Sequence, residues 1–135
     1  MGPQQDYTVL VIGEREDTLD TVVKGLTSGR INTCIVSEVN EAVSALESNS
    51  VDLFLLYRPT EQLKQYGILA RLRELKTTKS IPVVVVVDPE SEVLVRGAGD
   101  VLSIEHYVHA PPDIVQLQAL MNQICYVVKR VIVWQ

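Results

Sequence analysis

Val83-Val84-Val85-Val86-Val87 is an unbroken run of β-branched residues, and it sets the fold class of this chain of 135 residues. A run without polar alternation is typical of a strand that is covered by helices on both faces. Other apolar segments of strand length lie along the chain at residues 7–12, 31–36, 53–56 and 107–108. Together with the valine run, taken as residues 82–87, they predict a buried parallel sheet.

Segments with helical periodicity separate these strands. They lie at residues 19–26, 41–47, 67–75, 91–96 and from residue 112 onward. Asn40 is the expected N-cap of the second helix, and Pro112 is a first-turn residue of the fifth. Gly97-Ala98-Gly99 is expected to end the fourth helix with a left-handed glycine cap. Because right-handed crossovers of this length favour strand order 2-1-3-4-5, the sequence predicts an α/β fold, a flavodoxin-like (βα)5 doubly wound parallel sheet.

Composition indicates one compact domain. With 47% hydrophobic and 21% charged residues, the chain can bury a full core but has no room for a second domain. We expect that domain to span residues 7–130. Residues 1–6 are interpreted as a disordered terminus or an expression remnant, and residues 131–135 as an extension of the fifth helix.

The charge balance and the cysteine count argue against several functions. The net charge is −5, with 12 Lys and Arg against 17 Asp and Glu, so nothing draws the chain toward nucleic acid or an anionic membrane. No apolar run reaches the ~18 residues that a membrane helix needs. Cys34 and Cys125 lie in apolar patterns and are expected to be reduced thiols, without a metal. We therefore expect a cytoplasmic protein with neither nucleic-acid nor membrane partners.

The segment Asp52-Leu53-Phe54-Leu55-Leu56-Tyr57-Arg58-Pro59 resembles the third strand of a two-component receiver domain. In that family the residue after the paired leucines is the phosphate-accepting aspartate, and a proline closes the following loop. The resemblance extends from Val9 to about Val128. It places Tyr57 at the acceptor position, where a phenol cannot form an acyl phosphate.

The other receiver positions depart from the family pattern as well. The acidic pair that holds Mg²⁺ matches Gly13 and Glu14, the hydroxyl after strand four matches Val87, and the lysine before a proline matches Ala110. The resemblance therefore implies a pseudo-receiver, a non-enzymatic signal-transduction module without cofactor, metal or aspartyl phosphorylation. Its degenerate site comprises Gly13, Glu14, Tyr57, Val87 and Ala110.

The vacated site allows several interpretations. The Tyr57 ring is expected to fill the space with its hydroxyl at the solvent edge, while Arg58 pairs with Glu14 across the pocket. Glu16 and Asp17 are interpreted as first-turn residues that face the helix dipole. An alternative function is binding of a small aromatic ligand, a nucleotide or a quinone, in the pocket. A third interpretation is an ordinary phosphorylated receiver whose register has been misassigned.

The receiver resemblance also suggests how such a module would interact. Receivers usually communicate through the face of helix four, strand five and helix five. In the fifth helix, Ile114, Leu117, Met121, Ile124, Val128 and Val131 form a stripe expected to pack on the sheet. Leu120, Val127 and Trp134 form a second apolar set, so we expect a protein partner or a homodimer on this face. Residues 130–134 could instead form an extended strand.

Overall fold

The structure is a computed structural model that describes residues 7–59, 63–75 and 78–133, with side chains described as far as residue 125. Its strands are β1 (Tyr7–Ile12), β2 (Ile31–Val36), β3 (Leu53–Tyr57), β4 (Val83–Val87) and β5 (His106–His109). Its α-helices are α1 (Asp17–Ser28), α2 (Val39–Ser48), α3 (Lys64–Arg73), α4 (Glu92–Val101) and α5 (Ile114–Val133). No helix within these described ranges is long and apolar enough to cross a membrane.

The strands form a single parallel sheet in the order β2-β1-β3-β4-β5, which confirms the predicted fold and strand order. In the centre of the sheet, Val11 lies opposite Leu55, and Leu55 lies opposite Val84. The strands β1, β3 and β4 therefore have neighbours on both sides, and their carboxyl ends meet at one edge. In open sheets of this kind, that edge is where ligands gather.

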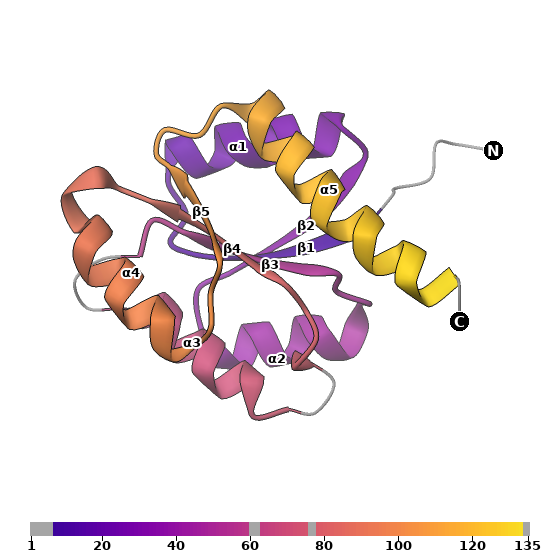
Figure 1. Cartoon of the computed structure of the whole chain (residues 1–135), viewed down its shortest axis with the longest axis horizontal. Coiled ribbons are helices and arrows are strands. Elements are labelled where there is room, and N and C mark those ends of the chain that lie inside the picture. The colour runs from indigo at the N-terminus through magenta and orange to yellow at the C-terminus, as the bar shows by residue number, and fades with distance from the viewer. Residues whose placement is uncertain (1–6, 60–62, 76–77, 134–135) are drawn as a thin grey trace.

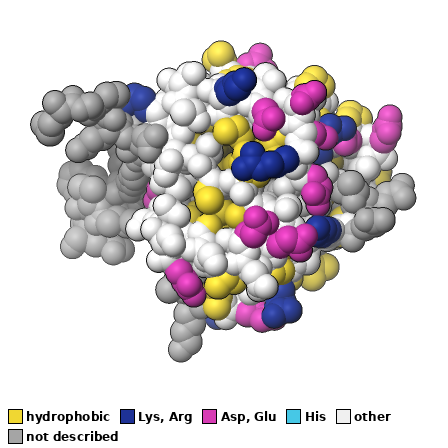
Figure 2. All heavy atoms as spheres, turned by 180° about the vertical axis from the view of Figure 1, so that it is seen from behind, with side chains coloured by type: hydrophobic (Ala, Val, Ile, Leu, Met, Phe, Trp, Pro, Cys, Tyr) yellow, Lys and Arg dark blue, Asp and Glu magenta, His cyan; other side chains and the backbone are white. Residues whose placement is uncertain are grey.

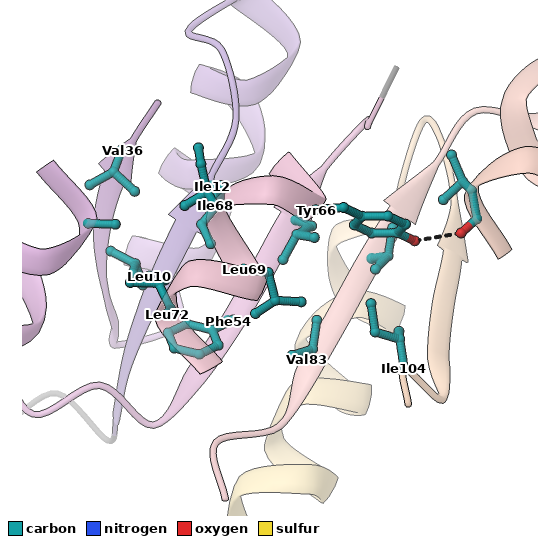
Figure 3. Packing of buried hydrophobic residues seen from close by; sticks show 14 of the residues in the cluster. Leu10, Ile12, Val36, Phe54, Tyr66, Ile68, Leu69, Leu72, Val83 and Ile104 are labelled. Atoms are coloured by element: carbon teal, nitrogen blue, oxygen red, sulfur yellow. Dashed lines mark hydrogen bonds between the residues drawn. The ribbon is translucent and has the colours of Figure 1, made fainter. Parts of the chain in front are cut away.

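Helices cover both faces of the sheet, as Figure 1 shows, with α1 and α5 on one face and α2 and α3 on the other. The valine run explains this arrangement, because successive strand residues point to opposite faces. Val84 and Val86 pack in the cluster beneath α1 and α5, whereas Val83, Val85 and Val87 pack in the opposite cluster. Figure 3 shows that opposite cluster, in which α3 lays its apolar side chains against β3 and β4.

The predicted end of the fourth helix is wrong. A short 3-10 turn at Pro89–Ser91 precedes α4, which continues through Gly97 and Gly99 to Val101. Neither glycine has a positive φ; the left-handed residue is Ser103, at φ 56°. Gly99 meets a different requirement, since a Cβ at that position would overlap the hydroxyl of Tyr107. Gly99 is therefore needed for close packing against Tyr107, and not for the left-handed helix cap that the sequence predicted.

Two other local predictions also need correction. The N-cap of α2 is Glu38 rather than Asn40, and the carboxylate of Glu41 accepts a hydrogen bond from the Ser37 backbone N–H at 3.1 Å. The bond fixes the chain just before the helix, and no side chain caps the first N–H groups of α2 itself. At the other end of the chain, α5 remains helical as far as Val133, so the extended alternative for residues 130–133 is wrong.

Candidate functional site

The candidate site lies at the carboxyl edge of the sheet, where β1, β3 and β4 end side by side. A shallow pocket of about 220 Å³ is lined by Glu14, Glu16, Tyr57, Arg58, Gln65 and Asp88. A neighbouring hollow of about 180 Å³ shares Tyr57, Arg58 and Asp88 and is completed by Thr18, Ala110 and Pro111. The fold therefore brings residues that are far apart in sequence to one edge, as the receiver resemblance implied.

Tyr57 fills the centre of this edge. Its side chain is only 3% exposed and packs in the cluster beneath α1 and α5. The hydroxyl donates a hydrogen bond to Thr18 Oγ1 at 3.0 Å. The ring thus fills space as expected, and its hydroxyl reaches the exposed Thr18, which lines the neighbouring hollow. Thr18 was missed from the sequence because nothing local marks it as the partner of a tyrosine 39 residues away.

Arg58 links two carboxylates across the pocket. Its Nη1 lies 2.7 Å from Glu16 Oε1, and its Nε donates to Asp88 Oδ1 at 3.0 Å. The Thr18 hydroxyl donates to the same Glu16 oxygen at 2.6 Å. Tyr57, Thr18, Glu16, Arg58 and Asp88 are therefore joined in one continuous chain of hydrogen bonds and ion pairs.

The predicted pair between Arg58 and Glu14 is wrong. Glu14 instead lies 3.2 Å from Lys64 Nζ, which also contacts Glu38 at 2.9 Å. One cause is the backbone of Arg58, which adopts the left-handed region at φ 51° and so fixes the direction in which its side chain leaves β3. Glu16, interpreted as a residue facing the helix dipole, pairs with Arg58 at the N-cap of α1.

Three charged groups at this edge, Glu16, Arg58 and Lys64, have pKa values shifted toward the ionised form. Hydrogen bonding to Asp88, supported by Glu16, raises the pKa of Arg58. The Thr18 hydroxyl and then Arg58 lower the pKa of Glu16. The pKa of Lys64 is raised by its hydrogen bonds to Glu38 and Glu14. The carboxylates at this edge are thus already paired, Glu16 and Asp88 with Arg58 and Glu14 with Lys64.

The residues of this site do not fit Mg²⁺. The ion needs several oxygen ligands in near-octahedral geometry, whereas Gly13 offers no side chain and the carboxylates already face Arg58 or Lys64. A Cβ at Gly13 would lie 3.1 Å from Tyr57 Cβ, so a longer side chain there requires a local shift. Across the described part of the chain, no group of three or more His, Cys, Asp or Glu could hold a metal ion.

The remaining predicted positions fall in different surroundings. Val87 ends β4 at this edge, but its side chain is buried in the core cluster of Figure 3 and lines neither hollow. Ala110 lines the second hollow, and its peptide bond to Pro111 is cis. Asp88, like Thr18, is a site residue that the sequence analysis did not identify. Its position directly after the valine run could have identified it, because ligands bind at the carboxyl ends of such strands.

The predicted interaction residues are placed only in part. Leu120 is half-buried and packs against the cluster beneath α1 and α5, so it does not belong to an exposed apolar set. The side chain of Val127 and all of Trp134 lie outside the described residues. Among the side chains that the structure describes, the most exposed large apolar ones are instead Val93, Val101 and Val115, at 89%, 85% and 74%.

Charge is mixed on the face of the molecule shown in Figure 2. Lys and Arg side chains alternate there with Asp and Glu side chains around small apolar areas, and no large basic area is visible. A nucleic-acid backbone is usually bound by a continuous basic surface, which this face does not offer.

Comparison with solved structures places the fold among receiver domains. A candidate response regulator from Chloroflexus aurantiacus has a TM-score of 0.76 at 16% identity, covering 89% of this chain and 98% of that one. The receiver domain of a histidine kinase from Syntrophus aciditrophicus gives 0.71 at 20%, covering 92% and 93%. A CheY-like receiver domain from Methylobacillus flagellatus gives 0.69 at 18%, covering 90% and 99%. At these identities, the likeness establishes the fold alone.

No protein-family model and no curated protein matches the sequence. The solved structures show that the chain has the fold of response-regulator receiver domains. Its function must therefore be argued from its own residues.

The Glu16 carboxylate is expected to make stability depend on pH. Because its pKa is lowered in the folded chain, its contribution is present above the unfolded pKa, ~4.3, and is lost as pH falls through the folded value. With the side chain 41% exposed, we expect a contribution below about 1 kcal/mol. Urea unfolding at pH 7 and pH 3 should show a smaller acid loss for Glu16→Gln than for the native chain. Glu47→Gln, at an exposed position on α2, should behave as native.

Proposed function

We propose that this chain is a receiver-like signal-transduction module that works without aspartyl phosphorylation and acts through protein contact. One observation carries the proposal: a buried tyrosine stands at the end of β3, where receivers hold the phosphoacceptor. The Tyr57 hydroxyl and the Arg58 guanidinium are bonded into a network of the chain's own side chains. These groups occupy the place at which a phosphoryl group and its metal would otherwise bind.

A conformational consequence follows for this module. A ligand can shift a protein between two states only if it binds them with different affinity. Without a phosphoryl group, that ligand is missing from the proposed mechanism, and the ion pairs of Arg58 hold the carboxyl edge in one arrangement. The module then keeps one binding-competent conformation, and the amount of complex it forms depends on the concentration of its partner.

The proposed docking surface lies on α4, β5 and α5. Val93, Gly97 and Val101 are spaced four residues apart on α4 and are exposed, which gives that helix an outward apolar stripe beside Leu94. Glu92 joins the start of α4 to the end of β5 through His109 Nε2 at 2.7 Å. Apolar side chains gathered on one exposed helix face are typical of protein interfaces. We propose that a second copy of the chain or another protein docks there.

Neither hollow at the carboxyl edge favours the alternative of a bound nucleotide or quinone. Pockets for ligands of that size usually measure roughly 300–1,000 Å³. The two hollows are about 220 and 180 Å³, and the Tyr57 ring already fills the space between the strands and α1. Protein contact is therefore the better supported function.

The double variant Val93→Ser/Val101→Ser is expected to remove self-association without unfolding the domain. Both side chains are almost fully exposed, so the free energy of unfolding should change by less than about 0.5 kcal/mol for each. Light scattering over a dilution series should show a concentration-dependent mass for the native chain and a monomer for the variant.

The matched control is Leu75→Ser, which replaces a 40% exposed leucine just after α3 and should associate as the native chain does. Persistent association of the double variant would place the interface elsewhere. A native chain that stays monomeric at high concentration would leave another protein as the only partner on this surface.

A further inference from the structure

A third hollow lies at the opposite end of the sheet, where β4 and β5 begin. It measures about 260 Å³ and runs between the entry to β4 and the connection from α4 to β5. The polar side chains that line it are Arg73, Lys79, Ser80, Ser103, Glu105 and His106. None of these residues belongs to the carboxyl-edge site or to the matched receiver positions, and only His106, at the start of β5, lies on an element of the proposed docking surface.

Arg73 is the unusual member of this group. It is the last residue of α3, and its guanidinium lies over the ring of Phe54, with Cζ 5.6 Å from the ring centroid. One of its N–H groups donates to the Thr78 carbonyl oxygen. A guanidinium carries five N–H donors in a fixed planar fork, so this single bond leaves most of its donors for another acceptor.

The charge of Arg73 is not balanced within the described part of the chain. Arg58, Arg71 and Arg96 each have a carboxylate within 4.0 Å, whereas no described carboxylate pairs with Arg73. Burial lowers the pKa of Arg73, and no described acidic group counters that effect. A half-buried cation is costly unless an anion or several acceptors satisfy it.

The local charge around the hollow is positive in a chain whose net charge is −5. Arg73 and Lys79 supply two cations against the single carboxylate of Glu105 when His106 is neutral. The hydroxyls of Ser80 and Ser103 can donate further hydrogen bonds. Guanidinium and ammonium groups beside hydroxyls are the groups with which proteins usually bind a phosphate.

We propose that this hollow is a binding site for a small phosphate-bearing anion, with Arg73 and Lys79 as its charged ligands and the two serines as hydrogen-bond donors. The volume limits the ligand, because about 260 Å³ lies below the roughly 300–1,000 Å³ of pockets for drug-sized molecules. A free phosphate or a short phosphate monoester fits that limit. Binding would tie the end of α3 to the connection between α4 and β5.

The test is an NMR titration of the ¹⁵N-labelled chain with sodium phosphate at constant ionic strength. We expect saturable shifts of the amides of residues 79–81 and 103–106, with a dissociation constant on the order of 1 mM. O-Phosphoserine at equal concentration separates a monoester from the free ion, and it should bind at least as tightly if the site takes monoesters. Sodium acetate in the third arm should cause no saturable shift.

Variants assign the site to its residues. Arg73→Gln should weaken phosphate binding by about tenfold or more, which is the usual effect of losing a charged hydrogen-bond donor. Lys79→Gln should weaken it several-fold, and because Lys79 is exposed, this variant remains informative if Arg73→Gln folds poorly. Arg71→Gln is the matched control, because Arg71 lies in the same last turn of α3 but pairs with Glu74. Its binding should equal that of the native chain.

Three results would overturn the proposal. Shifts that rise linearly with phosphate and never saturate would mean general ionic screening. Equal affinity for acetate would mean a site for any small anion, without preference for phosphate. Unchanged affinity in folded Arg73→Gln and in Lys79→Gln would show that the ion binds elsewhere.

Discussion

Tyr57→Asp is expected to lower the free energy of unfolding by roughly 3 kcal/mol and still leave the chain unphosphorylated. The substitution removes a ring that is 3% exposed and places a carboxylate in the cluster beneath α1 and α5. Under the proposal it supplies an acceptor carboxylate but leaves Gly13 without a metal-binding carboxylate, Val87 without a hydroxyl and Ala110 without a cation. Preorganised groups of that kind supply most of the stabilisation in phosphoryl transfer.

Urea unfolding measures the first effect, and intact mass after incubation with acetyl phosphate and Mg²⁺ measures the second. Tyr57→Phe is the matched control. It keeps the ring and loses only the hydrogen bond to Thr18, so it should cost about 0.5–1.5 kcal/mol. A phosphorylated Tyr57→Asp chain would show that Glu14, Glu16 and Asp88 can release their cations and serve a metal.

Gly99→Ala is expected to destabilise the chain by roughly 1–3 kcal/mol, although alanine favours a helix. The new Cβ would overlap the hydroxyl of Tyr107 and lie 3.2 Å from the hydroxyl of Tyr66. Neither ring can easily move. Tyr66 donates to the Val95 carbonyl oxygen at 2.8 Å, and Arg96 Cζ lies 4.4 Å from the centroid of the Tyr107 ring.

Two further variants isolate the cause of this loss. Gly97→Ala lies in the same helix with nothing within 4 Å of the new Cβ, so it should stabilise the chain by up to ~1 kcal/mol. Tyr107→Phe removes a buried hydroxyl that has no hydrogen-bond partner among the described residues, and combined with Gly99→Ala it should recover most of the lost stability. If Gly99→Ala and Gly97→Ala unfold at the same urea concentration, the packing of Tyr107 against α4 is not as described.

Much of the fold could be predicted from the sequence because its signals are local and repeated. Five valines in a row are typical of a strand with apolar side chains packed on both of its faces, and the structure buries all five. Gly97 and Gly99 misled for the opposite reason. A glycine signals both left-handed backbone and close packing, and only the position of Tyr107 decides between them.

The candidate site was predictable in its location and less so in its contacts. The parallel register brings the ends of β1 and β3 to one edge, so Glu14 and Tyr57 were expected to share a pocket and do so. The partner of Arg58 depends on its left-handed φ and on Asp88, which no local pattern specifies. The exposure of Leu120 was misjudged similarly, because apolar residues recur at helical spacing on two faces of the fifth helix and only the packed structure separates them.

The most direct measurement is the intact mass of the native chain after incubation with acetyl phosphate and Mg²⁺, beside a receiver domain that has its acceptor aspartate. We expect that control to gain one phosphoryl group per chain and this protein to keep its mass, since a tyrosine stands at the proposed acceptor position and Arg58 already holds Glu16 and Asp88. Stoichiometric gain of an acid-stable or acyl phosphate by the native chain, mapped to any residue of the carboxyl edge, would contradict the proposal of a phosphorylation-independent module.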